Sequence, residues 1–127
     1  MVDFKQKEKY DINDLLEIMR LLRAPGGCPW DAQQTHMSIR KNLIEETYEV
    51  IEAIDKDDKE LMTEELGDLL MQVVFHAQME QEAGNFDFGD VTDGVCKKLI
   101  ERHPHVFGEV EVSGVGDVLN NWDVIKR

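Results

Sequence analysis

The sequence predicts an all-α fold, a bundle of four to five helices. Apolar residues recur at intervals of three and four through most of the 127-residue chain, which is the period of an amphipathic helix. Strand-like alternation is confined to residues 106–112, a segment too short for a sheet. A chain of this length is expected to form one domain, residues 1–127, around its own hydrophobic core.

The first helix is predicted over residues 12–23, after a polar lead of ten residues. Asp11 is a suitable N-cap, and the apolar residues behind it share one face: Ile12, Leu15, Leu16, Met19 and Leu22. Residues 24–31 contain two prolines and two glycines, which exclude regular structure. We expect a shaped loop there.

Two longer helices are predicted to form a hairpin. The second helix covers about residues 38–54 and has a broad apolar arc: Leu43, Ile44, Thr47, Tyr48, Val50, Ile51 and Ile54. The third follows the polar turn 55–58 and extends to about Ala83, where Gly84 is a suitable left-handed terminator. Its stretch 66–75 is apolar on almost every side, which is typical of a buried helix. The short turn predicts antiparallel packing of the two helices.

Two further helical segments complete the predicted bundle. A fourth helix is expected from the Asp87 cap to just before Pro104, because proline disfavours helix in the residue ahead of it. A last segment begins near Asp117, where Val118, Trp122 and Ile125 share a face. It runs to Arg127, which leaves open whether the natural chain continues.

Charge and composition limit the partners. Twenty-seven acidic and fourteen basic residues give a formal net charge of -13, so polymeric nucleic acid and anionic membranes are repelled. No apolar run approaches the roughly twenty residues that span a bilayer. Cys28 and Cys96 lie far apart and no charged, apolar leader precedes them, so we expect a cytoplasmic protein without a disulfide framework.

Two pairs of acidic residues point to a metal site. Glu65 and Asp68 lie in the apolar third helix, about 60° apart on one side, and Glu46 and Glu49 repeat the same spacing on the second helix. Burying bare carboxylates is costly unless cations or donors surround them. A hairpin can bring the four together, where hard oxygen ligands suit Mg²⁺, with Mn²⁺ as an alternative.

Solvated helix faces are the alternative for acidic residues, and this is the expected role of Glu52, Glu60 and Glu64. The histidines and cysteines lack the spacing of a zinc site. Gly67 is unfavourable inside a helix by about 1 kcal/mol. Close approach of a neighbouring helix is the simplest compensation, although a steric role in packing alone is equally compatible.

Four segments, in order and at similar spacing, resemble the MazG nucleoside triphosphate pyrophosphohydrolases. The match covers roughly residues 11–127. The segments with their residues are Gly27-Cys28-Pro29-Trp30-Asp31 with Gln34-Thr35, Glu45-Glu46-Thr47-Tyr48-Glu49, Glu65-Leu66-Gly67-Asp68 continuing into Leu69-Leu70, and Arg102-His103-Pro104-His105-Val106-Phe107. The second and third correspond to the EExxE and ExxD signature of that family.

The resemblance implies a dimeric all-α bundle that cleaves nucleoside triphosphates to monophosphate and pyrophosphate. Glu46, Glu49, Glu65 and Asp68 would hold Mg²⁺ against the phosphates, and Glu45 would assist behind the ligands or as a base for water. The residues that the family places at the substrate are matched by Lys98, Arg102, Trp122 and Lys126.

Two further points stay open in the sequence. Trp30 and Trp122 can each stack on a base or pack in the core, and for Trp30 packing is the favoured role. The loop and the segment 102–107 resemble the first of two MazG copies in longer members. A catalytically silent dimerisation or regulatory module is therefore the alternative to an enzyme of the nucleotide pool.

Overall fold

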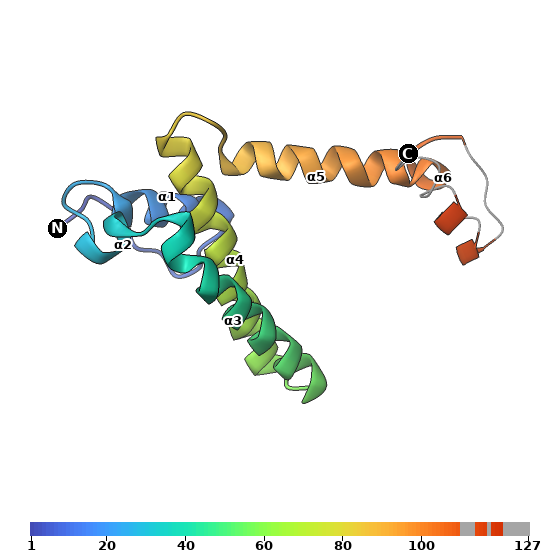
Figure 1. Cartoon of the computed structure of the whole chain (residues 1–127), viewed down its shortest axis with the longest axis horizontal. Helices are drawn as coiled ribbons and strands as arrows, with labels where there is room; N and C mark the ends of the chain where they lie inside the picture. The colour runs from blue at the N-terminus through green and yellow to red at the C-terminus, as the bar shows by residue number, and fades with distance from the viewer. Residues whose placement is uncertain (110–113, 117, 121–127) are drawn as a thin grey trace. The chain divides into compact units, whose positions relative to one another are not determined.

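The computed structural model describes residues 1–109, 114–116 and 118–120 (Figure 1). These residues contain helices and no strand, which confirms the all-α class. None of the described helices combines the length and apolar character needed to cross a membrane. The helices are α1 (Ile12–Arg23), α2 (Pro29–Gln33), α3 (His36–Asp55), α4 (Lys59–Glu82), α5 (Phe88–Arg102) and α6 (Pro104–Phe107).

The chain separates into two compact units, Met1–Phe88 and Gly89–Arg127. In the second unit, α5 ends ahead of Pro104 as predicted, and α6 begins at that proline. Residues 106 and 107 are helical, so the strand-like alternation there does not form a strand. Described residues 115–116 and 118–120 are also helical, in the region of the last predicted helix.

The bounds of α1 agree with the prediction, and its N-terminus shows why. The Asp11 side chain accepts a hydrogen bond from the Asp14 backbone N–H at 3.1 Å, and the Asp14 carboxylate accepts one from the Asp11 N–H at 2.9 Å. This reciprocal pair satisfies two backbone donors that the helix cannot satisfy itself. Asp11 is thereby confirmed as the N-cap.

The short helix α2 was missed, because the sequence around it was expected to be irregular throughout. Pro29 occupies its first turn, a position where the missing proline N–H is not needed. The irregular part is therefore limited to the residues before it. There a side chain at Gly27 would overlap the carbonyl oxygens of Leu21 and Leu22, so only glycine permits this close turn.

Helices α3 and α4 form the predicted antiparallel hairpin (Figure 1). Thr35 and Ser38 form a reciprocal capping pair, so α3 begins two residues earlier than expected. Asp58 caps α4 through the Leu61 N–H at 3.1 Å. Gly84 has a φ of 78° just beyond α4, which confirms the left-handed terminator.

The buried core of the first unit lies where α1 crosses one end of the hairpin. Its members come from α1, the start of α3 and the second half of α4. Leu15, Leu16 and Phe88 pack against it as partly buried residues. The buried cluster comprises Met19, Ile39, Val74, Phe75 and Met79.

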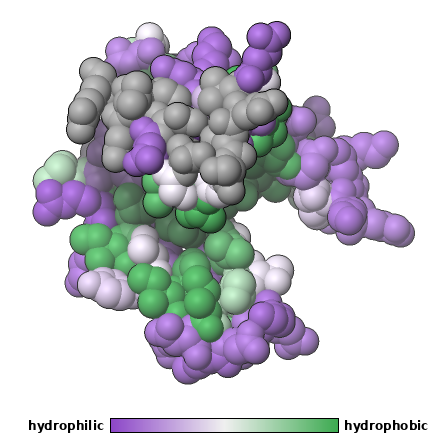
Figure 2. All heavy atoms as spheres, turned by 90° about the vertical axis from the view of Figure 1, so that its right-hand side faces the viewer, coloured by the Kyte–Doolittle hydropathy of each residue, from purple (hydrophilic) through white to green (hydrophobic). Residues whose placement is uncertain are grey.

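Much of the hairpin's apolar surface remains exposed, contrary to the prediction of a fully buried helix. On α4, Leu66 is 49% exposed and Leu70 is 39% exposed. On α3, Ile44, Tyr48 and Ile51 are also exposed. Figure 2 shows apolar side chains gathered at the surface. The apolar pattern predicted burial, but the described helices of the first unit supply no neighbour for this face.

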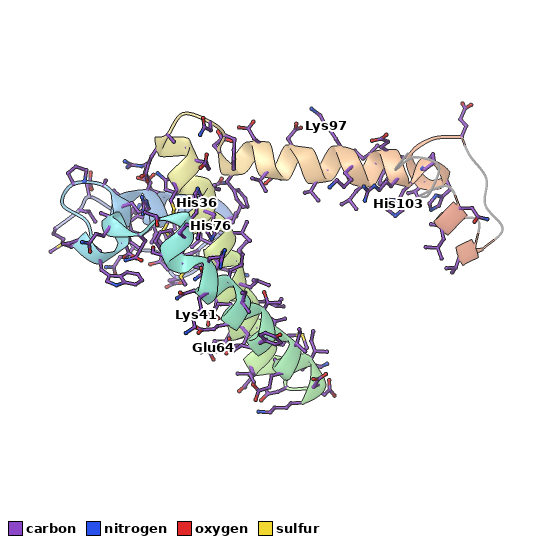
Figure 3. All side chains as sticks on the ribbon, viewed as in Figure 1. His36, Lys41, Glu64, His76, Lys97 and His103 are labelled. Atoms are coloured by element: carbon purple, nitrogen blue, oxygen red, sulfur yellow. The ribbon has the colours of Figure 1, made fainter. Side chains whose placement is uncertain are left out.

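A histidine pair joins the start of α3 to α4 near the core. The rings of His36 and His76 stack with centroids 5.0 Å apart, and their Nδ1 atoms lie 2.7 Å apart (Figure 3). The other ring nitrogen of His36 lies 2.7 Å from a Glu80 carboxylate oxygen. Burial, together with the neighbouring His36, lowers the pKa of His76. The pair therefore favours a neutral His76 in this polar contact between the two helices.

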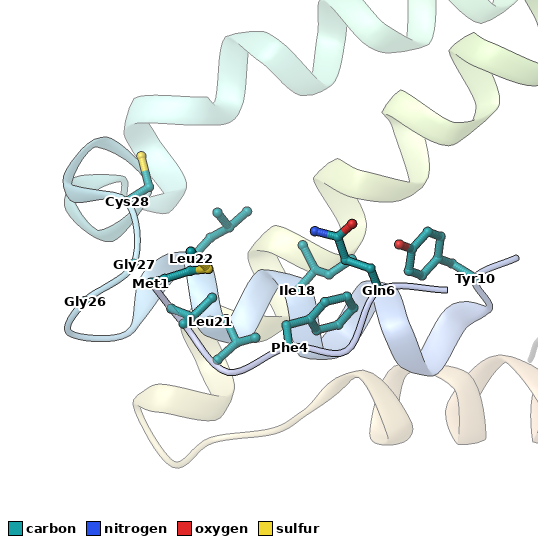
Figure 4. A pocket seen from close by; sticks show the side chains of 11 residues that line it. Met1, Phe4, Gln6, Tyr10, Ile18, Leu21, Leu22, Gly26, Gly27 and Cys28 are labelled. Carbon is teal, nitrogen blue, oxygen red and sulfur yellow. The ribbon is translucent and has the colours of Figure 1, made fainter. Parts of the chain in front are cut away.

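A cavity of about 640 Å³ lies between the N-terminal segment and α1 (Figure 4). Phe4, Tyr10, Leu21 and Leu22 contribute to its walls, and Cys28 lies at one end. None of its lining side chains carries a charge. The acidic residues that the sequence predicts as a metal site are not among its lining residues, so the candidate site lies elsewhere.

Arg23 fastens the loop and α2 to α4. Its side chain is 8% exposed and forms a two-pronged ion pair with Glu82 at 2.9 and 3.0 Å. The same guanidinium donates to the carbonyl oxygens of Asp31, at 2.6 Å, and Gln34, at 3.1 Å. It also lies 5.4 Å from the centre of the Phe75 ring. The hydrogen bond from Arg23 is the main reason why the pKa of Glu82 is lowered.

Replacing Arg23 with methionine is expected to lower the free energy of unfolding by about 2 kcal/mol, because one carboxylate and two carbonyls lose their donor. Chemical denaturation measures the change. Arg20→Met is the matched control on the same helix. Its partner Glu17 is exposed, so the loss should stay within about 0.5 kcal/mol. Equal losses in both variants would contradict the role of Arg23.

Candidate metal centre

Four carboxylates converge between α3 and α4. Glu46 and Glu49 come from α3, and Glu65 and Asp68 come from α4. One oxygen of each can be chosen so that all four lie within 4.8 Å of one another. Glu65 is 9% exposed, Glu46 and Asp68 are half-buried and Glu49 is exposed. The sequence expectation that the hairpin brings these side chains together agrees with this geometry.

The proximity of the carboxylates shifts their protonation. A hydrogen bond to Glu49, followed by burial and the charges of Glu49, Asp68 and Glu46, raises the pKa of Glu65 to about 7. Burial and then the charge of Glu49 raise the pKa of Glu46. In the described part of the chain, no lysine or arginine forms an ion pair with any of the four. The cluster is therefore short of positive charge.

Unsatisfied oxygens identify what the cluster can accept. One carboxylate oxygen of Glu46 and one of Glu65 are buried without a hydrogen-bond partner among the described residues. Buried polar atoms of folded proteins usually have such partners. A divalent cation that prefers carboxylate oxygens, such as Mg²⁺ or Mn²⁺, fits this donor set.

The fifth predicted acidic residue, Glu45, is not one of the four converging carboxylates, although its charge contributes to the raised pKa of Glu46. The Glu45 carboxylate is 54% exposed and lies 3.8 Å from the Lys41 ammonium, one turn earlier on α3. An exposed pair of this length contributes little to stability. The Glu45 carboxylate is therefore accessible from solvent.

The structure places the predicted substrate residues in different parts of the chain. Trp30 lies on α2 and is 57% exposed, so the expectation that it packs in the core is wrong. Arg23 fastens its loop instead, which leaves the ring free. Lys98 is exposed and Arg102 half-buried on α5, in the second unit. Trp122 and Lys126 lie outside the described residues.

Gly67 lies between the two acidic residues of α4 without the close neighbour that was expected. A Cβ at this position would meet nothing within 4 Å among the described residues. The first unit therefore supplies no neighbouring helix at Gly67, and the close approach that was predicted is not found within that unit. The open space adjoins the exposed side chains of Leu66 and Leu70.

Two carboxamide side chains, one on α3 and one on α4, lie on the helix faces that carry the acidic residues, and they were assigned no role from the sequence. Gln72 is 4% exposed, and its carbonyl oxygen has no hydrogen-bond partner in the part of the chain that is described. Asn42 is half-buried on α3. Each lies four residues from an acidic residue, Asp68 and Glu46 respectively, which is the spacing that identifies one helix face.

A family model described as the MazG nucleotide pyrophosphohydrolase domain matches residues 34–107 of this chain. The match covers more than half of the sequence and includes the whole α3–α4 hairpin. The chain belongs to the MazG family. The sequence resemblance is thereby confirmed, and the four converging carboxylates lie inside the matched segment.

Curated relatives in the MazG family are similar over most of this chain. The nucleoside triphosphate pyrophosphohydrolase/pyrophosphatase MazG of Thermotoga maritima is 51% identical over 113 residues, 89% of this chain and 43% of that protein. The nucleoside triphosphate pyrophosphohydrolase of Escherichia coli K12 is 50% identical over 116 residues, 91% of this chain and 44% of that protein. The chain thus spans less than half the length of these relatives.

A solved structure extends the MazG likeness to the fold. The crystal structure of a mazG-related protein from Thermotoga maritima matches with a TM-score of 0.74 at 29% sequence identity. The match covers 91% of this chain and 98% of that one. The helical architecture is therefore that of a solved MazG-related protein.

Glu65 predicts how the stability of the metal-free protein depends on pH. Its folded pKa of about 7 exceeds the ordinary value of 4.5, so the folded chain binds the proton more tightly than the unfolded chain. The free energy of unfolding should therefore fall as the pH rises from 4.5 to about 7. At higher pH the full loss of stability should persist, because Glu65 is ionised in both the folded and the unfolded chain. Thermal unfolding in chelator across this range measures the slope.

Glu65→Gln is neutral at every pH and should remove part of that slope. Added Mg²⁺ should stabilise the parent protein most at the high end of the range, where the carboxylates are ionised and bind a cation best. A slope that is the same in Glu65→Gln and in the parent protein would contradict the assignment of the raised pKa to this residue.

Proposed function

We propose that the chain hydrolyses nucleoside triphosphates to nucleoside monophosphate and pyrophosphate in the presence of Mg²⁺. The observation that carries the proposal is the cluster of Glu46, Glu49, Glu65 and Asp68, four carboxylates without a basic partner in the described chain. Two relatives named as pyrophosphohydrolases support the reaction. Cleansing of the nucleotide pool in the cytoplasm is the corresponding biological role.

The four carboxylates are the proposed ligands of the cation, with Mn²⁺ as an alternative to Mg²⁺. When bound, the ion supplies positive charge to the polyphosphate and lowers the pKa of the attacking water. The unsatisfied oxygens of Glu46 and Glu65 fit this role, since they are buried and lack other partners. The half-buried position of Asp68 and the exposed one of Glu49 leave the cluster open to a substrate on one side.

The remaining residues have proposed roles around the phosphates and the base. Glu45 is exposed and precedes the proposed ligand Glu46 in the sequence, and it would take the proton of the attacking water. Exposed Trp30 would stack on the base. Lys98, Arg102, Lys126 and Trp122 are proposed as substrate contacts on the family resemblance alone.

We also propose that the chain acts as one MazG-like domain and as a homodimer. The family match from residue 34 to 107 extends across the boundary between the two compact units. A second copy is the proposed cover for the exposed apolar face of the hairpin, which includes Tyr48, Ile51 and Leu66. Open space at Gly67 supports the same proposal, because a partner helix can approach closely there.

Pyrophosphate release tests the reaction. A panel of nucleoside triphosphates is offered to the protein with Mg²⁺ or with chelator, and to Asp68→Asn and Glu49→Gln. Both variants should lose more than about 100-fold in rate, since even groups behind metal ligands are worth about 10- to 100-fold. Glu64→Gln is the control, because this exposed residue lies next to Glu65 outside the cluster (Figure 3).

Release that depends on Mg²⁺ and is lost in the two variants but retained in Glu64→Gln would support the enzyme. The absence of release from every nucleotide in the panel would contradict it and would favour the silent dimerisation module.

Association tests the proposed dimer. Ile51→Glu introduces a charge into the exposed apolar face, so burying that face against a second copy becomes unfavourable. Size-exclusion chromatography with light scattering should show a dimer for the parent protein and a monomer for this variant. Gln81→Glu adds the same charge at an exposed polar position and should remain dimeric. A monomeric parent protein would contradict the proposal.

A further inference from the structure

Gln72 is a buried polar side chain without an explanation in the fold. It is 4% exposed, and no donor among the described residues reaches its carbonyl oxygen. A buried acceptor without a partner costs about 1–3 kcal/mol, so a sequence selected for stability alone would favour an apolar residue here. The position of Gln72 relative to the acidic cluster suggests what its partner is.

The helical geometry places Gln72 on the same face as the acidic residues of α4. At about 100° per residue, Gln72 falls between Glu65 and Asp68 in angular position and lies about 6 Å beyond Asp68 along the helix axis. On α3, Asn42 falls in the same way between Glu46 and Glu49 in angle, one turn before Glu46. Both carboxamides thus continue the faces that carry the acidic residues.

The antiparallel pairing brings these two carboxamides to the same end of the cluster. Carboxylate oxygens of Glu49 and Glu65 lie within 4.8 Å of each other, and His36 contacts His76 further along the pair. Interpolation between these two contacts places Asn42 at the level of Gln72. Beyond them the seam between the helices is closed by buried Ile39 and Phe75.

Along this seam the four carboxylates are followed by two neutral carboxamides, and beyond these lie buried Ile39 and Phe75 and the His36–His76 pair. A nucleoside triphosphate has the same order of groups on either side of the bond to be cleaved. Its charged phosphates suit a cation held by the carboxylates, and its neutral sugar is joined to the first phosphorus through one ester oxygen. The sugar thus lies a short distance from the cation, as the carboxamides lie from the cluster.

We propose that Gln72 and Asn42 form the nucleoside end of the site, where the Gln72 carbonyl oxygen accepts a hydrogen bond from a sugar hydroxyl of the substrate. This inference rests on the proposed function. A carboxamide at this place binds the sugar rather than the cation, because a rise of about 6 Å along the axis separates Gln72 from Asp68, the nearer of the two acidic residues of α4. Its neutral oxygen also attracts a cation less than a carboxylate does.

The first test uses the free protein and requires no activity. Gln72→Met keeps the length of the side chain and removes the unsatisfied acceptor, so the midpoint of thermal unfolding should stay the same or rise. Gln78→Met is the matched control on the same helix, where the carboxamide donates to Glu82 at 3.2 Å. A fall in the midpoint for Gln72→Met alone would show a structural partner and would overturn the proposal.

The second test measures binding of nucleotides that cannot be cleaved, so its outcome does not depend on hydrolysis. Titration calorimetry with Mg²⁺ measures the affinity of three α,β-methylene nucleoside triphosphates. The first has both sugar hydroxyls, the second lacks the 2′-hydroxyl and the third lacks the 3′-hydroxyl. Inorganic triphosphate is the fourth ligand. The parent protein should bind one of the deoxy analogues about ten-fold more weakly than the full nucleotide, the effect of one neutral hydrogen bond.

Gln72→Met should bind the full nucleotide about ten-fold more weakly and should no longer distinguish it from that deoxy analogue. Its affinity for inorganic triphosphate, like all affinities of Gln78→Met, should be unchanged. Equal loss for every ligand, inorganic triphosphate included, would assign Gln72 to the cation and overturn the sugar contact. Failure of the parent protein to release pyrophosphate, with this binding pattern intact, would overturn the reaction and leave the nucleoside contact standing.

Discussion

Repulsion among the four carboxylates between α3 and α4 is the constraint on which the rest of the structure depends. The capped ends of both helices and the short turn between them fix the register that holds Glu49 against Glu65. Since no described lysine or arginine pairs with the cluster, its charge is reduced by a proton or a cation, and the pKa of Glu65 near 7 reflects the first of these. The core around Val74 offsets the cost at the other end of the hairpin.

The division of the hairpin into a covered and an uncovered end follows from the position of α1. Buried residues such as Ile39 and Phe75 belong to the end that α1 crosses, and Arg23 fastens the loop to that end. The carboxylates and the exposed side chains of Tyr48 and Leu66 belong to the other end. The acidic site therefore lies in the part of the first unit that its other helices cover least.

Signals that act within one helical turn predicted the helices well, whereas the burial of individual side chains, which depends on distant neighbours, was predicted less well. The Asp11 cap and the Gly84 terminator act within one turn, so their effect is readable from the residues alone. The two acidic pairs were predictable because helix periodicity fixes their face. The burial of the α4 side chains was not predictable, because an apolar stripe on a helix does not reveal which other segment covers it. The exposed Trp30 depends likewise on Arg23, a contact between residues that the loop brings together.

The charge of the whole chain clarifies why a cation is central to the proposed chemistry. At a net charge of -13, the chain repels a polyphosphate at long range, and the four converging carboxylates contribute to that repulsion. A divalent ion held by Glu46, Glu49, Glu65 and Asp68 reverses the local sign and makes the same place attractive. The neutral end beside Gln72 then needs no such reversal to accept an uncharged sugar. A purely structural copy would gain nothing from this arrangement, since four apolar residues would hold the hairpin together at lower cost.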